Sequence, residues 1–157
     1  MNQNERAGFV IRRLHRTISK RFEAGAKAEG IDEVTLMHGW MMRYLYQQRD
    51  TDVFQKDIEK AFSIGRSTVT GILKAMEQKG LIVRESVEYD ARLKKVMLTQ
   101  KGIETHERIE GVAEQSELNM TKGIPKEELE MFFQVAEKMR QNLEMEKNQC
   151  EENGRSE

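Results

Sequence analysis

The sequence predicts a mainly α-helical protein with one small β-hairpin, an α+β arrangement. Apolar residues recur at helical spacing through most of the chain, as in Val10, Leu14 and Ile18. Only two short runs, residues 81–84 and 95–98, are instead rich in residues typical of β-strands. A chain of 157 residues is long enough for one domain with its own core. We therefore expect a single domain over residues 1–157.

The first half of the sequence predicts four helices. The first covers residues 5–30, and a cap within residues 32–35 starts the second. Two shorter helices follow at 54–62 and 66–79, separated by the tight turn at 63–65. We expect the second helix to direct five apolar or aromatic side chains inward: Leu36, Trp40, Met41, Tyr44 and Leu45.

The second half predicts the hairpin and two longer helices. The strands are expected at 81–84 and 95–98, with a long polar tip at 85–94 between them. Gly80 stands where a helix commonly ends in a left-handed residue, and Thr99 can cap the next helix. Pro125 suits the first turn of the last helix. We expect residues 148–157 to form a disordered tail.

The charge distribution favours an anionic partner. The net charge is −1, but residues 56–101 carry ten Lys and Arg against six Asp and Glu. Residues 102–157 carry seven against fourteen. A local excess of positive charge attracts phosphate even when the whole molecule is close to neutral.

Other features narrow the class of protein. We find no run of the roughly 20 apolar residues that a membrane helix needs, and no apolar segment typical of a secretory signal. Cys150 is the only cysteine, which fits a reducing compartment and an inert thiol. We therefore expect a cytoplasmic protein without a membrane partner. No nucleophile with its base and no glycine-rich phosphate loop is evident, so we expect no enzyme and no cofactor.

The order of elements around residue 70 is that of a winged helix-turn-helix lobe, expected over residues 36–102. A short helix and a tight turn precede an amphipathic helix, and a hairpin follows. The amphipathic helix has one polar face, which can enter the major groove of duplex DNA. The DNA-binding residues expected on it are Arg66, Ser67, Thr68, Thr70 and Lys74.

The hairpin supplies a second candidate contact with DNA. Arg92 lies in the expected tip, where an arginine can enter a narrow minor groove. Asp90 is two residues away and can orient Arg92 or brace the wing. Lys94 and Lys95 follow as further candidates, although lysines also protect exposed strand edges from aggregation.

These motifs resemble the MarR family of bacterial regulators. The resemblance is carried by residues 55–102 and extends over nearly all of residues 5–147 through the flanking helices. Its most discriminating part is the Asp90-Ala91-Arg92 wing followed by Leu98-Thr99-Gln100-Lys101-Gly102. The turn departs from many such motifs, because Ser63 stands where Gly is frequent and Gly65 where Ser or Asp often caps the helix.

The resemblance implies a homodimer that binds a pseudo-palindromic operator in double-stranded DNA and represses transcription. It places a helical dimerisation region in the helices at 5–30 and 103–147. Its expected contacts are Phe9, Val10, Leu14, Leu129, Phe132, Phe133 and Ala136. The resemblance also implies a small aromatic effector, held in a crevice that could be lined by His38, Trp40, Met41 and Tyr44.

Two other interpretations remain open at this point. Winged helices also serve as protein-protein interaction modules without specific DNA binding, and the acidic C-terminal third is compatible with such a role. A metal site could form if His38 approached His106, Glu107 and Glu110. We expect no metal, because no motif fixes the remaining ligands.

Overall fold

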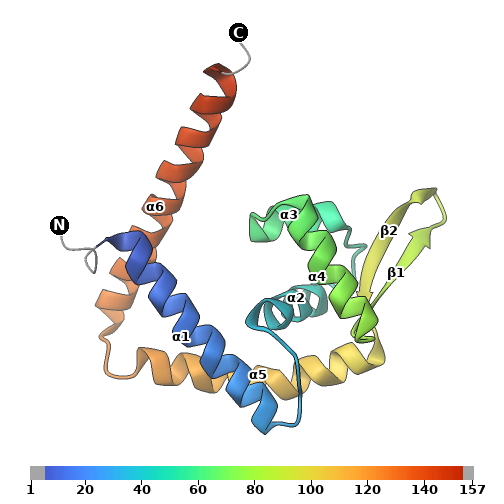
Figure 1. The fold of residues 1–157 in the computed structure, drawn as a ribbon, viewed down its shortest axis with the longest axis horizontal. Coiled ribbons are helices and arrows are strands. Elements are labelled where there is room, and N and C mark those ends of the chain that lie inside the picture. The colour runs from blue at the N-terminus through green and yellow to red at the C-terminus, as the bar shows by residue number, and fades with distance from the viewer. Residues whose placement is uncertain (1–5, 154–157) are drawn as a thin grey trace. The chain divides into compact units, whose positions relative to one another are not determined.

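The computed structural model describes residues 6–153 and the side chains of residues 6–145 except that of residue 91. It confirms the mainly α-helical class with one hairpin (Figure 1). The chain divides into two compact units after Ser116. The elements are α1 (Ala7–Ala28), α2 (Leu36–Gln47), α3 (Gln55–Phe62), α4 (Arg66–Gln78), β1 (Ile82–Val87), β2 (Asp90–Leu98), α5 (Gln100–Thr121) and α6 (Lys126–Asn153).

The core of the first unit lies among α2, α3, α4, the hairpin and the first half of α5. Its largest fully buried side chains are Met41, Met42, Ile58, Val69, Leu73, Met76, Ile82 and Ile109. Burial of each such side chain contributes about 1.5–3 kcal/mol. Trp40 was expected inside but is 43% exposed, because it lies about 200° around α2 from the buried Met42.

The two halves of α1 have different surroundings. Its C-terminal half packs on the core through Phe22 and Ala26, which are both buried. Gly39 of α2 allows this close approach, since a Cβ there would lie 2.6 Å from Cζ of Phe22. Val10 and Leu14 continue the same apolar stripe but are exposed within this single chain.

The end of α4 is tied to the start of α5. Gly80 has φ +69°, and the Gly80 and Leu81 amides donate to the carbonyls of Glu77 and Met76, both at 2.9 Å. This confirms the expected left-handed helix end. The Thr99 hydroxyl donates to the Gly80 carbonyl at 2.6 Å and accepts from the Gly102 amide at 3.0 Å. We call this connection the α4–α5 clasp.

The hairpin strands are longer than the sequence pattern indicated. They pair antiparallel from Ile82 opposite Leu98 to Ser86 opposite Lys94, and Val87 then pairs with Asp90. The long polar tip expected at 85–94 is therefore wrong, because only residues 88–89 form the turn. A two-stranded ribbon is held by backbone hydrogen bonds, so charged side chains do not by themselves end it.

The second unit contains the long helix α6. Pro125 immediately precedes it, and its carbonyl accepts the amides of Glu128 and Leu129 at 3.1 and 3.2 Å. α6 includes residues 148–153, which we had expected in the tail, because they lack the Gly and Pro that end helices. Residues 154–157 and the Cys150 side chain lie outside the described part. No helix among the described residues is long and apolar enough to cross a membrane.

Candidate nucleic-acid interface

Helix α4 separates its apolar and polar residues onto two faces. Val69, Leu73 and Met76 are fully buried and fix the helix on the core. The opposite face is exposed along its length and carries Arg66, Ser67, Thr68, Thr70, Gly71 and Lys74. The residues expected from the sequence thus share one accessible face, and most of them are small or able to form hydrogen bonds.

The turn before α4 accommodates its unusual residues. Ser63 adopts the left-handed conformation with φ +51°, and its amide donates to the carbonyl of Lys60 at 3.3 Å. Ile64 is half-buried and packs against the core. Gly65 is the N-cap without a side-chain cap, so the first amides of α4 remain available to an anion.

The wing is braced at its tip by Asp90. Its carboxylate accepts the backbone amide of Arg92 at 2.9 Å, so it orients the main chain at Arg92. The pairing register breaks between Ser86 and Val87, and residues 91–93 of β2 lie in this irregularity. A bulge of this kind re-aims side chains near the end of a ribbon. Arg92 itself is exposed.

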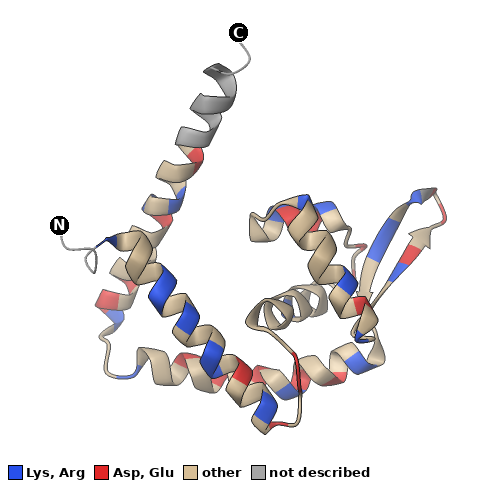
Figure 2. Ribbon diagram, viewed as in Figure 1, with Lys and Arg blue, Asp and Glu red and all other residues tan. Residues whose placement is uncertain are grey.

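A hollow of about 360 Å³ lies between α3, the start of α4 and the hairpin. It brings together three of the residues expected from the sequence, Arg66, Arg92 and Lys94. Lys56 and Arg84 line it as well, and Glu59 is the only carboxylate among its described lining residues. Lys and Arg positions on α3 and on both strands are visible in Figure 2. We call this feature the cationic hollow.

Sequence reasoning had not assigned Lys56 or Arg84 to this site. Arg84 forms an ion pair with Glu77, and its Nε lies 3.2 Å from Oε2 of that carboxylate. The hydrogen bond from Arg84 lowers the pKa of Glu77 and raises that of Arg84. The register of the hairpin determines which side of the ribbon carries Arg84 of β1. The basic character of residues 56–101 was the signal in the sequence that pointed to this region.

The structure separates Lys95 from the other candidates. Neighbouring residues on a strand point to opposite faces, and Lys94 lines the cationic hollow. Lys95 instead lies 3.6 Å from the carboxylate of Asp52, which precedes α3. Of the two wing lysines, Lys94 is therefore the one placed for contact with an anion in the hollow.

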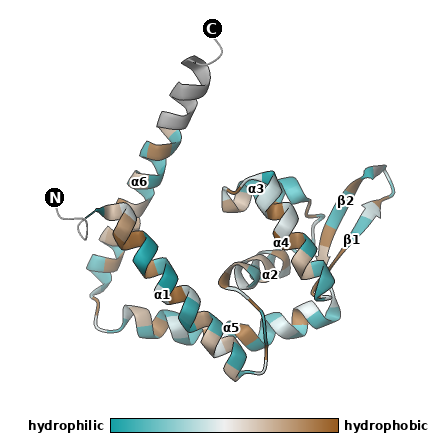
Figure 3. Ribbon diagram, viewed as in Figure 1, coloured by the Kyte–Doolittle hydropathy of each residue, from teal (hydrophilic) through white to brown (hydrophobic). Residues whose placement is uncertain are grey.

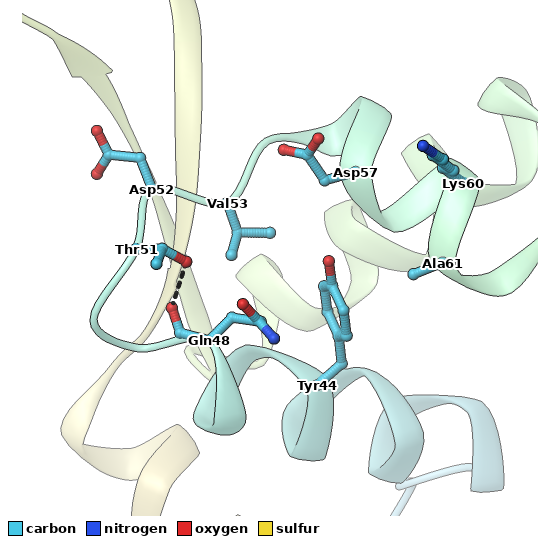
Figure 4. Close-up of a pocket in the computed structure, with 8 residues that line it drawn as sticks. All are labelled: Tyr44, Gln48, Thr51, Asp52, Val53, Asp57, Lys60 and Ala61. Atoms are coloured by element: carbon cyan, nitrogen blue, oxygen red, sulfur yellow. Dashed lines mark hydrogen bonds between the residues drawn. The ribbon is translucent and has the colours of Figure 1, made fainter.

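The four residues expected around a ligand crevice have different surroundings in the described part of the chain. His38 lies in the cap of α2, Trp40 meets His15 edge-on at a ring distance of 6.4 Å, and Met41 is fully buried. Tyr44 lines an open hollow of about 490 Å³ between α2 and α3, together with Val53 and Lys60 (Figure 4).

The two histidines considered as metal ligands lie near opposite ends of α2, with His38 in its first turn and His106 on α5 beside its last turn. The imidazole Nδ1 of His38 accepts the Thr35 amide at 3.2 Å, and the Thr35 hydroxyl accepts the His38 amide at 3.3 Å. His106 of α5 packs on the ring of Tyr46 with 4.7 Å between centroids. No group of three metal-ligating side chains is found among the described residues.

His106 predicts a loss of stability in mild acid. It is 5% exposed, and its Nδ1 lies 3.6 Å from Glu110, too far for a hydrogen bond. Burial lowers the pKa of His106, and the charge of Arg43 lowers it further, against the opposite effects of Glu110 and Glu107. The unfolded chain therefore binds the proton more readily, and stability should fall as the pH drops below about 6.5.

Urea unfolding between pH 7.5 and 5 measures this effect. We expect His106→Gln to flatten the dependence on pH, whereas His15→Gln on the exposed face of α1 serves as the control for loss of an imidazole. Identical slopes for the wild type and His106→Gln would contradict the assignment.

The residues expected at a dimer interface are accessible in the single chain. Phe132 and Phe133 of α6 are 53% and 58% exposed, and Phe9, Val10 and Leu14 of α1 are exposed as well. Ala136 is exposed and Leu129 is half-buried. Hydrophobic positions recur along both helices in Figure 3.

Comparison with known proteins agrees with this arrangement. Residues 33–93 match the model of the MarR family. The S. aureus MepR-DNA complex is similar over 90% of this chain and 99% of that chain, with 25% identity and a TM-score of 0.79. The transcription regulator MarR from Oenococcus oeni PSU-1 is 28% identical over 87% of this chain and 99% of its own, with a TM-score of 0.70.

A third similar structure is the heme sensor protein PefR from Streptococcus agalactiae in complex with heme. It is 27% identical, covers 90% of this chain and 97% of its own, and has a TM-score of 0.65. The matched segment contains α2 to the wing tip, and the structural likeness extends over most of the chain. The chain therefore resembles the MarR family of winged-helix transcription regulators in sequence over residues 33–93 and in fold over most of its length.

Proposed function

We propose that this chain is a sequence-specific transcriptional regulator that binds a pseudo-palindromic operator in double-stranded DNA as a homodimer and represses transcription. The observation that carries the proposal is the cationic hollow, where Arg66, Arg92 and Lys94 from α4 and β2 meet beside the exposed face of α4. A helix in the major groove with a wing arginine beside it is a known docking arrangement for DNA. The similar MepR chain was solved as a DNA complex.

The exposed apolar residues of α1 and α6 support the homodimer. Surfaces of this kind on a soluble chain mark a contact with another protein, and a second copy is the usual partner. The proposal includes an effector, expected to be small and aromatic, that shifts the dimer between states of different DNA affinity. The similar PefR chain was solved with heme, which also presents an aromatic ring system.

Selection from a pool of random duplex DNA at moderate salt tests the function. We expect enrichment of an inverted repeat with half-sites about 10 base pairs apart. A lack of enrichment that persists after unfolding and refolding without small molecules would contradict the proposal. It would leave the winged helix as a protein-interaction module.

The dimer is tested by replacing Phe132 and Phe133 together with serine. Both side chains are exposed in the single chain, so the fold of each chain should survive. Loss of two buried aromatic side chains should weaken the dimer by about 3–5 kcal/mol or more. Analytical ultracentrifugation should show a monomer at concentrations where the wild type is dimeric. Gln134→Ser on the same helix is the control, and an unchanged dimer would remove this face of α6 from the interface.

Gly71 provides a separate test of the major-groove contact. A Cβ at this exposed position of α4 would have no heavy atom within 4 Å, so the fold does not require glycine. Gly71→Ala should therefore raise the free energy of unfolding by roughly 0.5–1 kcal/mol. The added methyl would occupy the face that we place in the groove, and DNA affinity should fall several-fold in a titration. Gly111→Ala, also in open space on a helix, should leave affinity unchanged. Unaltered affinity in Gly71→Ala would contradict the docking.

A further inference from the structure

Gln55, the first residue of α3, connects the two helices of the helix-turn-helix. Its amide nitrogen lies 2.9 Å from the hydroxyl oxygen of Thr70, 2.9 Å from a carboxylate oxygen of Glu59 and 3.4 Å from the carbonyl oxygen of Arg66. Helices α3 and α4 lie side by side in Figure 1. The side chain of Gln55 therefore reaches across to the exposed face of α4, where the proposed base contacts lie.

The surroundings determine which way the amide of Gln55 points. Glu59 and the Arg66 carbonyl can only accept hydrogen bonds. Rotating the amide by 180° would place its carbonyl oxygen against these oxygens. The NH₂ group must therefore face Glu59, Arg66 and Thr70, and Gln55 donates to the hydroxyl of Thr70.

Two hydrogen bonds together fix the hydroxyl rotor of Thr70, one to the carbonyl of Arg66 and one from Gln55. A hydroxyl has one proton and two acceptor lone pairs. The Thr70 proton is donated to the carbonyl of Arg66 at 2.8 Å, and one lone pair accepts from Gln55. Only a lone pair remains for a further partner. Thr70 consequently offers an acceptor, and no donor, on the exposed face of α4.

We propose that Gln55 is a positioning residue that makes Thr70 an obligate hydrogen-bond acceptor, so that Thr70 selects adenine or cytosine on the strand that it faces. In the major groove, adenine presents the N6 donor and cytosine the N4 donor, whereas guanine and thymine present acceptors at O6 and O4. This inference rests on the proposed function and adds the chemistry of one base position to it.

Selection from random duplex DNA with variant proteins tests the inference. Thr70→Val first identifies the position that Thr70 faces, as the one whose base preference disappears. At that position the wild type should favour adenine or cytosine by roughly five-fold over guanine or thymine. Gln55→Ala and Gln55→Met should reduce this preference, because the Thr70 hydroxyl then loses one of the two partners that fix its rotor and can also turn its proton toward the DNA. Their melting temperature and the salt dependence of non-specific binding should remain those of the wild type.

Gln100→Ala provides a matched control. Gln100 donates to Glu104 at 3.0 Å in the same i,i+4 arrangement, but on α5 and with no hydrogen bond to Thr70 of α4. Its base preferences should equal those of the wild type. Preference for guanine or thymine in the wild type, an unchanged preference in both Gln55 variants, or a Thr70→Val profile identical to wild type would overturn the role of Gln55 alone. Absence of any enriched sequence with the wild type would overturn the proposed function and this role together.

Discussion

Replacing Gly102 with alanine is expected to lower the free energy of unfolding by about 3 kcal/mol, the upper range for forcing an atom into a packed interior. A Cβ at Gly102 would overlap the carbonyl oxygen of Leu81 and lie 3.2 Å from Cδ2 of Leu98. The carbonyl cannot rotate away, because it is backbone and accepts the Thr99 amide at 3.0 Å. Relief would require α5 to move away from the end of α4.

Urea unfolding monitored by circular dichroism measures this loss. Gly111→Ala is the matched control, since it lies on the same helix and its Cβ would meet open space. We expect that variant to be at least as stable as the wild type, because alanine favours helix. A stability of Gly102→Ala within 0.5 kcal/mol of the wild type, small beside the expected cost, would show that the junction yields more easily than this geometry implies.

Replacing Arg92 with alanine is expected to weaken binding to the selected operator by roughly 1–3 kcal/mol, which is about 5- to 150-fold. Asp90 holds the main chain at Arg92, and the side chain lines the cationic hollow with Arg66. Alanine removes a charge from the place where we expect the minor groove. Lys94→Ala should act differently, lowering affinity for all sequences alike and reducing the salt slope by about 1.

Fluorescence anisotropy titrations with operator and unrelated DNA at several salt concentrations distinguish these effects. Lys95→Ala is the control within the same strand, because Lys95 pairs with Asp52 outside the hollow. Its affinity should stay close to that of the wild type. Equal losses for Lys95→Ala and Arg92→Ala would mean that general positive charge, rather than the wing tip, governs binding.

Local signals in the sequence were sufficient for much of the fold. Gly80 ends α4, and Thr99 begins α5, because each residue acts through hydrogen bonds to its near neighbours in the chain. The extent of the hairpin was not predictable in the same way. Strands β1 and β2 continue through polar residues whose pairing depends on register, which side-chain hydropathy does not encode.

The candidate site followed from the sequence only in part. Arg66 and Arg92 were identified by their places in the helix and the wing. Arg84 and Gln55 were missed, because their roles arise from contacts between elements that no local spacing reveals. Trp40 was expected to face the core because of its apolar character. The side of α2 that faces the core instead carries Met41 and Met42.

The α4–α5 clasp has a mechanical consequence. The hydroxyl of Thr99 holds the Gly80 carbonyl, the Leu81 carbonyl holds the Thr99 amide, and Lys101 Nζ donates to the Lys79 carbonyl at 2.7 Å. Three hydrogen bonds at this connection leave α4 and the first turn of α5 little freedom to move relative to each other. A tilt of the first turn of α5 would then tilt α4 with it. The proposed effector would then alter the orientation of α4 by tilting α5, without rearranging the buried core of the first unit.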